Sequence, residues 1–256
     1  MILCLDVGNS LIVGGVFADE ELRFQFRLAT QGRPSSDEIG VFLRSVLREN
    51  EQSWQQIEAI ALCSVVPDLV HSLRNACLKY FDHEPFVLQT GVKTGLKINY
   101  RDPREVGSDR IAAAVAATHK FPGQNLIVAD FGTATTLEVV TADRNYLGGA
   151  ILPGVQLSMR ALDANTARLP AVEIIKPAVA IGRSTVESIQ SGLYYSTLGA
   201  IRLLVERIAD EAFQGERPLL IATGGFSSLF RDEQDFDQII PDLILHGLRI
   251  THAINT

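Results

Sequence analysis

The sequence predicts an α/β protein built from two similar halves with a cleft between them. Two short stretches half a chain apart, DVGNS at residues 6–10 and DFGTA at residues 130–134, each follow one apolar run and precede another. The order of predicted strands and helices around the first stretch returns around the second. Between them, the alanine-rich segment 109–121 favours a helix that can pack closely against its neighbours. We therefore expect a duplicated domain, with halves spanning residues 1–117 and 118–256.

The first half opens with strands. Residues 2–7 and 11–17 are predicted to form two strands around a polar turn, and the alternating segment 22–30 a third antiparallel strand. Ser35 and Glu38 have the spacing of a capping box at the start of a helix. The apolar stripe of that helix comprises Ile39, Phe42, Leu43, Val46 and Leu47.

The rest of the first half alternates strands and helices. The continuous apolar run 57–66 favours a buried parallel strand, and Pro67 marks the start of the next helix. The stripe of this second helix includes Leu69, Leu73, Ala76, Cys77 and Tyr80. Segment 85–89 is predicted to be a short strand.

The second half repeats this order. Strands are predicted within residues 125–140 and 146–153, and helical segments follow, the longest from about residue 185 to 213. Segment 217–225 favours a buried strand that ends in glycines, and segment 241–255 favours a closing helix.

Composition limits the partners and the compartment. The formal net charge of −7 gives no general basic field, so neither nucleic acid nor an anionic membrane is an expected partner. The chain start lacks the basic region of a signal peptide, and no apolar run approaches the roughly 20 residues of a membrane helix. Cys4 and Cys63 are expected to be reduced core thiols, and the histidines lack zinc-site spacing. Together these features predict a cytoplasmic protein.

The repeated turns have a chemical interpretation. A hairpin tip with glycine and small polar residues presents several backbone N–H groups, which can bind a phosphate without lysine. The aspartate before each tip, Asp6 or Asp130, would repel that phosphate unless a cation lay between them. One such turn alone is more often a surface hairpin. Two of them at the starts of equivalent halves favour phosphate binding.

Segment 102–117 carries a further candidate. Pro103 and Ser108 are signals for the start of a helix, which places Asp109 and Arg110 in a first helical turn. The carboxylate of Asp109 could simply stabilise the helix start. Alternatively, Asp109 is a general base at the mouth of the cleft, beside an arginine that binds an anionic substrate group.

Five stretches together carry a family resemblance, in the order DVGNS (6–10), DPREVGSDRIAAAVAA (102–117), DFGTATT (130–136), GGAILPGVQLS (148–158) and IGRSTVESIQSG (181–192). They resemble the type III pantothenate kinases of the acetate and sugar kinase, Hsp70 and actin superfamily. The resemblance implies duplicated ribonuclease H-like (actin-like ATPase) halves with a central cleft. It also implies ATP-dependent phosphorylation of pantothenate to 4′-phosphopantothenate, the first step towards coenzyme A.

The same resemblance implies roles for individual residues. The ATP-binding residues it implies are Asp6, Val7, Gly8, Asn9, Ser10, Leu11, Ile12, Val13 and Thr133. The substrate-binding residues are Tyr100, Gly107, Ser108, Asp109, Arg110 and Thr185. Asp109 is implied as the proton acceptor, Asp6 as a Mg²⁺ residue that can act through water, and Asp130 as a ligand of K⁺ or NH₄⁺. Leu11 and Ile12 depart from the polar residues of many relatives, so their nucleotide contacts stay open.

The resemblance also implies a homodimer, and the long helix from Thr185 is more apolar than one buried face requires. Two alternatives to the kinase remain. A nucleotide-binding transcription accessory factor would keep the ATP turns without needing Asp109. A phosphatase or polyphosphate hydrolase of the same superfamily would use water in place of the pantothenate hydroxyl. The Asp109–Arg110 pair favours the kinase.

Overall fold

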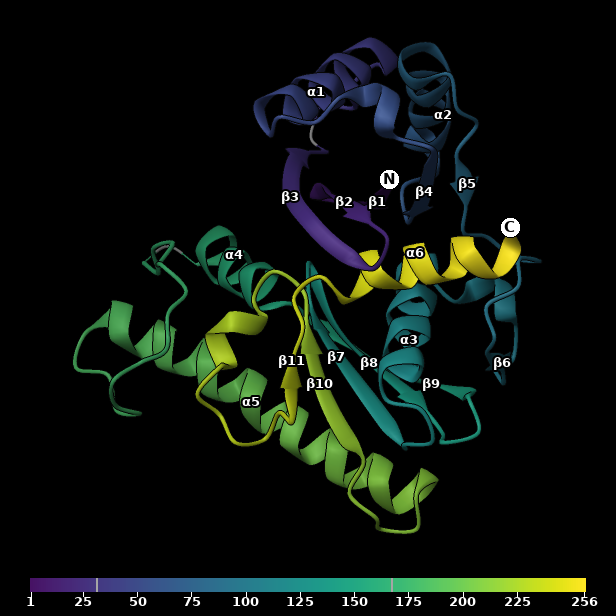
Figure 1. Ribbon diagram of the computed structural model, residues 1–256. Coiled ribbons are helices and arrows are strands. Elements are labelled where there is room, and N and C mark those ends of the chain that lie inside the picture. The colour runs from purple at the N-terminus through teal and green to yellow at the C-terminus, as the bar shows by residue number, and fades with distance from the viewer. Residues whose placement is uncertain (31, 167) are drawn as a thin grey trace. The chain divides into compact units, whose positions relative to one another are not determined.

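The computed structural model describes residues 1–30, 32–166 and 168–256, and the chain divides into two compact units (Figure 1). Unit 1 comprises residues 1–96, 101–116 and 243–256, and unit 2 comprises residues 97–100 and 117–242. The division within the alanine-rich helix lies one residue from the predicted boundary. The C-terminal segment, which the prediction placed in the second half, groups with unit 1.

Unit 1 contains a five-stranded sheet in the order β3-β2-β1-β4-β5. Its strands are β1 (Ile2–Val7), β2 (Leu11–Ala18), β3 (Glu21–Ala29), β4 (Ala59–Ser64) and β5 (Phe86–Val87). β1 pairs antiparallel with β2, as β2 does with β3, whereas β4 runs parallel to both β1 and β5. β4 and β5 are shorter than the predicted strands, because pairing with a neighbour covers only part of each apolar run.

The helices of unit 1 begin where the sequence signals predict. They are α1 (Ser36–Glu49), α2 (Pro67–Phe81), α3 (Ser108–Lys120) and α6 (Leu243–Asn255), with 3₁₀ turns η1 (Trp54–Gln56) and η2 (Pro103–Glu105). α3 starts in unit 1 and ends in unit 2. The predicted capping box is confirmed: the Ser35 hydroxyl accepts from the backbone N–H of Glu38 at 3.3 Å, and the Glu38 carboxylate accepts from Ser35 N at 2.8 Å.

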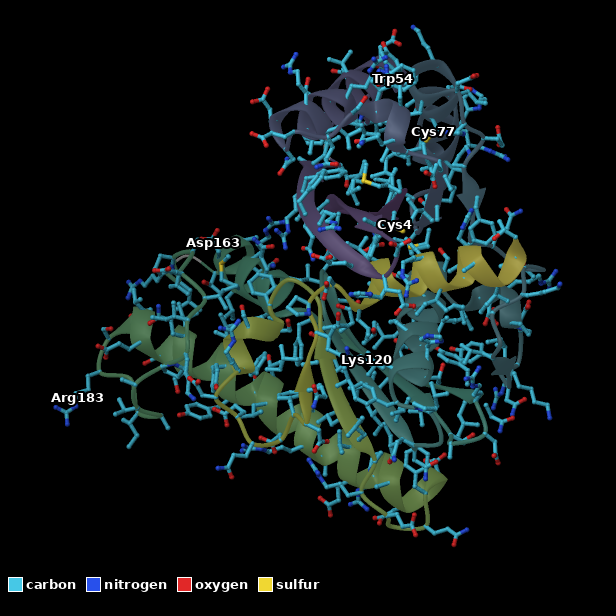
Figure 2. All side chains as sticks on the ribbon, in the orientation of Figure 1. Cys4, Trp54, Cys77, Lys120, Asp163 and Arg183 are labelled. Atoms are coloured by element: carbon cyan, nitrogen blue, oxygen red, sulfur yellow. The ribbon has the colours of Figure 1, made fainter. Side chains whose placement is uncertain are left out.

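Each face of the unit 1 sheet is covered by different helices. Leu3, Leu5 and Val7 of β1 are buried in a core with the apolar stripes of α1 and α2. On the other face, α6 packs against β2, where Leu245 fills the space above Gly15 and the His246 ring lies 5.0 Å from that of Phe17. Because Gly15 pairs with Cys4, this second face also carries Cys4 and Asp6. The three cysteines, Cys4, Cys63 and Cys77, are buried free thiols. Figure 2 labels Cys4 and Cys77.

Unit 2 contains a six-stranded sheet in the order β11-β10-β7-β8-β9-β6. Its strands are β6 (Lys97–Ile98), β7 (Leu126–Phe131), β8 (Ala134–Val140), β9 (Asn145–Pro153), β10 (Leu219–Thr223) and β11 (Gln238–Ile239), and its helices are α4 (Val155–Asn165), α5 (Thr185–Ala212) and the 3₁₀ turn η3 (Ser227–Phe230). The core on one face joins this sheet to α5, and its aromatic centre contains Phe131, Tyr194, Phe230 and Phe236.

The two sheets repeat one topology. In unit 2, β7 pairs antiparallel with β8, β8 antiparallel with β9, and β10 lies parallel to β7 and to β11. Strands β7 to β11 therefore occupy the positions of β1 to β5, and β6 is an addition at the β9 edge. The predicted duplicated, ribonuclease H-like architecture is confirmed. No helix among the described residues is long and apolar enough to cross a membrane.

The contact between α3 and α6 within unit 1 gives a stability prediction. Gly247→Ala is expected to lower the free energy of unfolding by roughly 1–3 kcal/mol, because a Cβ would overlap the Ala112 carbonyl group. Urea unfolding measures the change. Gly199→Ala in α5 is the matched control: its Cβ would meet nothing within 4 Å, and we expect a gain of up to about 1 kcal/mol. An unchanged midpoint for Gly247→Ala would contradict this close helix packing.

Candidate active site

The hairpin tip at residues 8–10 of unit 1 is held by its own backbone and by Thr30. Gly8 N donates to the Leu11 carbonyl at 3.0 Å, which closes the turn. Thr30, directly after β3, donates from its backbone N–H to the Ser10 carbonyl at 3.0 Å and from its hydroxyl to the Gly8 carbonyl at 2.9 Å. Thr30 is 5% exposed, so these bonds are shielded from water. They fix the tip in one conformation.

The corresponding tip of unit 2 is built in the same way but is shorter. Gly132 N donates to the Ala134 carbonyl at 3.0 Å, and Gly154 N, directly after β9, donates to the Thr133 carbonyl at 3.2 Å. Gly154 thus takes the place of Thr30. A side chain at Gly154 would overlap the Thr133 and Gly132 carbonyl oxygens, so only glycine fits there.

Asp6 is the penultimate residue of β1, beside β4. It is paired in register with Cys63, and the Cys63 thiol donates to Asp6 Oδ1 at 3.4 Å. Burial and then the charge of Asp109 raise the pKa of Asp6 to about 7, against the lowering effect of the thiol hydrogen bond. Burial, followed by the charge of Asp6, raises the pKa of Cys63, which keeps the thiol protonated as a donor. Asp6 therefore carries a proton easily unless a cation stabilises its charge.

Asp109 occupies the second position of α3. Its Oδ1 accepts from Arg110 N at 2.8 Å, and the carboxylate lies over Gly107, where any Cβ would overlap it. Burial raises the pKa of Asp109, and the Arg110 backbone bond and charge oppose this rise. The Gly-Ser-Asp-Arg motif therefore has a geometric reason: glycine leaves the space that the carboxylate fills. A half-buried carboxylate with a raised pKa is suited to accept a proton.

Ser108 attaches this helix start to the sheet. Its hydroxyl donates to the Ser64 carbonyl and accepts from Ser64 N, both at 3.2 Å. Ser64 ends β4, one residue after Cys63, and its own hydroxyl bonds with the backbone of Val66. Asp6, which is paired with β4, and Asp109, which follows Ser108, are thus both held at the end of β4, and their charges interact.

The raised pKa of Asp6 predicts a pH dependence of stability. A carboxyl whose folded pKa lies above its unfolded value stabilises the fold at low pH, and this contribution disappears as pH rises through the folded pKa. Without divalent cations, we expect the free energy of unfolding to fall by roughly 1–3 kcal/mol between about pH 5 and pH 8. Asp109 contributes in the same direction.

Denaturant unfolding across this pH range measures the effect. Asp6→Asn should flatten the profile and make the variant more stable than the wild type at pH 8. Asp68→Asn, which removes an exposed carboxylate from the first turn of α2, is the control and should leave the profile unchanged. A wild-type profile that rises with pH would show that Asp6 is ionised in the free protein.

Asp130 is the unit 2 counterpart of Asp6. It is the penultimate residue of β7 and lies in register with Thr223 of β10. A side chain at Gly224, whose φ is +87°, would overlap its Oδ1. Thr223 is fully buried, and its hydroxyl has no hydrogen-bond partner among the described residues. A carboxylate beside an unpartnered hydroxyl supplies two hard oxygen donors, which fits a monovalent cation such as K⁺. No cluster of three His, Cys, Asp or Glu residues suited to a metal occurs in the described parts of the chain.

The remaining predicted substrate residues lie elsewhere in unit 2. The Tyr100 ring packs on Gly148 of β9, whose φ of +107° and missing side chain leave room for it. Thr185 begins α5, where Ser184 caps the helix by accepting from Glu187 N at 3.2 Å.

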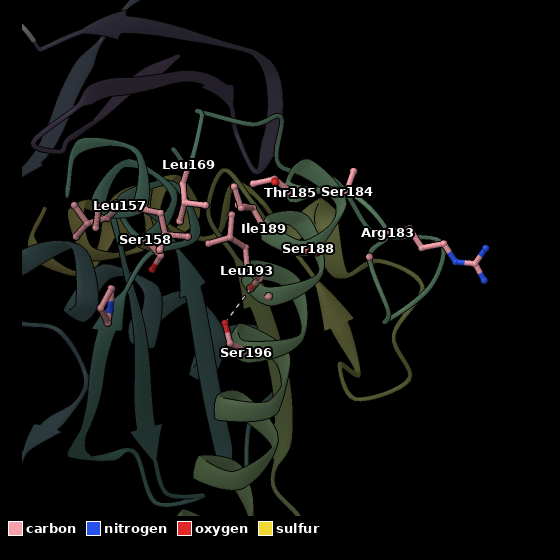
Figure 3. Close-up of a pocket in the computed structure, with 15 residues that line it drawn as sticks. Leu157, Ser158, Leu169, Arg183, Ser184, Thr185, Ser188, Ile189, Leu193 and Ser196 are labelled. Carbon is pink, nitrogen blue, oxygen red and sulfur yellow. Dashed lines mark hydrogen bonds between the residues drawn. The ribbon is translucent and has the colours of Figure 1, made fainter. Parts of the chain in front are cut away.

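Thr185 lines a cavity of about 1180 Å³ between α4 and α5, with mostly apolar walls that include Leu157, Leu162, Leu169, Ile189 and Leu193. Figure 3 shows Arg183 directed away from these side chains. The cavity is large enough for a small organic molecule.

The predicted ATP residues divide by exposure. Asn9 and Leu11 are exposed, and Gly8, Ser10 and Val13 are half-buried. Val7 and Ile12 are at most 1% exposed and belong to the core of unit 1, so only their backbone atoms could reach a nucleotide.

Several supporting residues escaped sequence reasoning, namely Thr30, Cys63, Ser64, Gly154 and Thr223. Each lies within one residue of the C-terminal end of a strand that pairs with an aspartate-bearing strand or its hairpin. Strand register, which no single motif encodes, was the missing signal.

Comparison with known proteins finds similar sequences over the full length of the chain. A family model described as type III pantothenate kinase matches residues 2–207. A Legionella pneumophila (strain Corby) protein named Type III pantothenate kinase is 58% identical over 256 residues, 100% of both chains. A Francisella tularensis subsp. holarctica (strain OSU18) protein named Type III pantothenate kinase 1 is 47% identical over 255 residues, 100% of both. In fold alone, a Campylobacter jejuni structure assigned to the Baf family of transcriptional activators matches with a TM-score of 0.62 at 19% identity, covering 99% of this chain and 98% of that one.

Proposed function

Because the chain belongs to the type III pantothenate kinase family, we infer that it is an ATP-dependent kinase that phosphorylates pantothenate to 4′-phosphopantothenate in coenzyme A biosynthesis. The observation that carries the chemistry is the placement of Asp109. Its carboxylate is held over Gly107 at the start of α3 and has a raised pKa beside Asp6. A half-buried carboxylate of this kind can take the proton of an alcohol as that alcohol attacks phosphorus.

We propose a specific role for each site residue. Asp109 accepts the proton of the pantothenate hydroxyl late in a loose transition state. Arg110 binds an anionic group of the substrate, and Ser108 keeps the loop on β4 through its bonds to Ser64. Tyr100, Gly107 and Thr185 are the remaining substrate residues. The 1180 Å³ cavity beside Thr185 supports this assignment, because it offers apolar walls to a partly apolar substrate.

Residues 6–13 and Thr133 are proposed to bind ATP. Support comes from the two rigid tips, each of which is fixed by a backbone bond from the residue after the third strand of its unit. Rigid backbone N–H groups stabilise phosphate charge without having to reorganise during the reaction.

Two cations complete the proposal. Phosphoryl-transfer enzymes of this kind generally use a divalent metal, which neutralises charge on the phosphates. We assign Mg²⁺ to Asp6, directly or through water, and a monovalent cation, K⁺ or NH₄⁺, to Asp130. Each carboxylate stands beside a proposed phosphate-binding tip, where without a cation it would repel the phosphate.

The decisive experiment is an assay of the purified protein with ATP, Mg²⁺ and pantothenate, with and without KCl. We expect 4′-phosphopantothenate and ADP in equal amounts, with faster turnover in KCl. ATP binding without any phosphorylation of pantothenate would favour the transcription accessory factor. Release of inorganic phosphate without phosphopantothenate would favour a hydrolase.

We also propose that the protein is a cytoplasmic homodimer that needs neither nucleic acid nor a membrane. Large exposed apolar side chains support the dimer, because most of those among the described residues belong to unit 2. They are Leu147, Ile151, Leu157, Ile175, Val179, Ile181, Val186, Tyr195 and Leu203. Such an accumulation is typical of a surface that another protein covers.

A charge substitution tests this dimer. Ile181 is 80% exposed, so Ile181→Glu should cost the folded monomer almost nothing but should convert a dimer into a monomer at micromolar concentration. Analytical ultracentrifugation measures the mass. Val41→Glu on α1 of unit 1, where Val41 is 55% exposed, is the control and should leave the dimer intact. A wild-type protein that sediments only as a monomer would count against the dimer and would weaken the role of Thr185.

A further inference from the structure

The duplication allows the two aspartates to be compared position by position. Asp6 of β1 is paired in register with Cys63 of β4, and Asp130 of β7 is paired in register with Thr223 of β10. Residues paired across parallel strands point to the same face of the sheet. Each unit therefore places one small side chain with a polar hydrogen directly beside its aspartate.

The two partners behave differently. The Cys63 thiol donates to Asp6 at 3.4 Å, so its hydrogen is used. The Thr223 hydroxyl is fully buried and lacks any hydrogen-bond partner within the described residues, although Asp130 is its neighbour in the register. An unsatisfied buried hydroxyl costs about 1–3 kcal/mol, and valine would fill the same space without that cost. Threonine at this position therefore needs a reason beyond packing.

The surroundings of Thr223 indicate the kind of ligand. Gly224, with a φ of +87°, brings its backbone so close to Asp130 that no side chain fits between them. The site thus combines a carboxylate, a hydroxyl oxygen and the backbone of a glycine turn. A weakly hydrated monovalent cation is bound by several oxygens of this kind, which replace its water shell. A thiol such as Cys63 is a soft ligand and would serve such a cation poorly.

We propose that the Thr223 hydroxyl is a direct ligand of the monovalent cation that Asp130 binds, so that unit 2 holds this cation while Cys63 denies unit 1 an equivalent site. The inference rests on the cation assignment of the proposed function. It adds a ligand to that assignment and a reason why only one of two equivalent aspartates binds K⁺.

Cation binding can be measured apart from turnover. Wild-type protein and variants are placed in tetramethylammonium chloride with Mg²⁺ and a non-hydrolysable ATP analogue. They are titrated with KCl while the melting temperature is followed, and with Tl⁺ as a K⁺ substitute observed by ²⁰⁵Tl NMR. A ligand that binds only the folded state raises the melting temperature as its concentration exceeds its Kd.

Thr223→Val should raise the Kd of K⁺ and Tl⁺ by about 10- to 100-fold, the usual effect of losing a group that supports a metal site. Without K⁺ the variant should melt no lower than the wild type, because it buries no unsatisfied hydroxyl. Thr223→Ser keeps the oxygen and should keep the Kd within about threefold.

Thr135→Val is the matched control. Thr135 is 1% exposed and its hydroxyl is also unpartnered, but it pairs with Phe131 and so points to the opposite face of the same sheet. Its K⁺ response should equal that of the wild type. If Thr223→Val fails to fold, Thr223→Cys, which imitates Cys63 in the other unit, should fold and lose the K⁺ response.

The outcomes separate this inference from the proposed function. A Thr223→Val protein with wild-type Kd for K⁺ and Tl⁺ would overturn the inference while the kinase assignment stands. A wild-type protein that binds neither ion would overturn it as well. The protein could also bind Tl⁺ in a way that depends on Thr223 but never phosphorylate pantothenate. That outcome would support the inference and contradict the proposed reaction.

Discussion

Asp109→Asn is expected to lower kcat by about two to four orders of magnitude, the usual contribution of positioned acid–base catalysis. The Kd values of ATP and pantothenate should change little. The asparagine amide cannot accept a proton from the hydroxyl, but its oxygen can still accept the Arg110 N–H bond, which is 2.8 Å long in the wild type. Steady-state kinetics and calorimetric binding measure the two effects separately.

The variant should also be stable, because burial raises the pKa of Asp109 and removal of a desolvated charge favours the fold. Asp68→Asn is the matched control: Asp68 is likewise the second residue of a helix in unit 1, but its side chain is exposed. We expect wild-type turnover and a change in stability of at most about 0.5 kcal/mol for it. Near-normal turnover of a folded Asp109→Asn protein would refute the general-base role.

The sequence predicted the duplication because local signals agreed with each other. The capping box of Ser35 and Glu38, Pro67 at a helix start, and two apolar runs ending in aspartate each mark one element boundary. The structure places these boundaries within a few residues of the prediction. Short strands such as β5 and β11 were less predictable, since two residues carry almost no periodicity.

The C-terminal helix shows what local signals cannot provide. Its apolar pattern predicts a helix correctly, yet α6 belongs to unit 1, although most of the chain that precedes it forms unit 2. The reason lies in packing: Gly247 meets the backbone of Ala112 in α3, and Leu245 fills the space above Gly15 in β2. The local sequence does not show which surface a helical glycine will pack against. Contacts between residues far apart in the chain decide which unit the helix joins.

The candidate site likewise contains some residues that the sequence indicates and others that only the structure reveals. Asp6 and Asp130 stood out because charged residues rarely end apolar runs. Asp109 is an ordinary residue for a first helical turn and stood out through the family resemblance. Their supports, Cys63 and Thr223, look like ordinary core residues until the strand register sets them beside Asp6 and Asp130. The strand register determines which residues lie beside these aspartates. The duplicated sheets show that register, and the motifs do not.

Asp130→Ala is expected to lower kcat roughly a hundredfold or more and to abolish the stimulation of turnover by K⁺, with the fold intact. Whether kcat falls or rises in Asp130→Ala shows whether the carboxylate binds a cation. If the tip beside Asp130 binds the phosphates of ATP, as proposed, the aspartate repels ATP, and its removal should help the reaction unless a cation is present. A large loss means that the carboxylate holds a positive charge there.

Turnover as a function of KCl concentration measures this loss, and a melting curve confirms the fold. Asp143→Ala, which removes an exposed carboxylate from the turn between β8 and β9 of the same unit, is the control and should respond to K⁺ like the wild type. The K⁺ response of Thr223→Val should be weaker than that of Asp143→Ala and stronger than that of Asp130→Ala. The variant removes one oxygen but keeps the charge of Asp130. An Asp130→Ala protein with full activity and an unchanged K⁺ response would make Asp130 a structural residue of its hairpin, and the monovalent-cation site would have to be sought elsewhere.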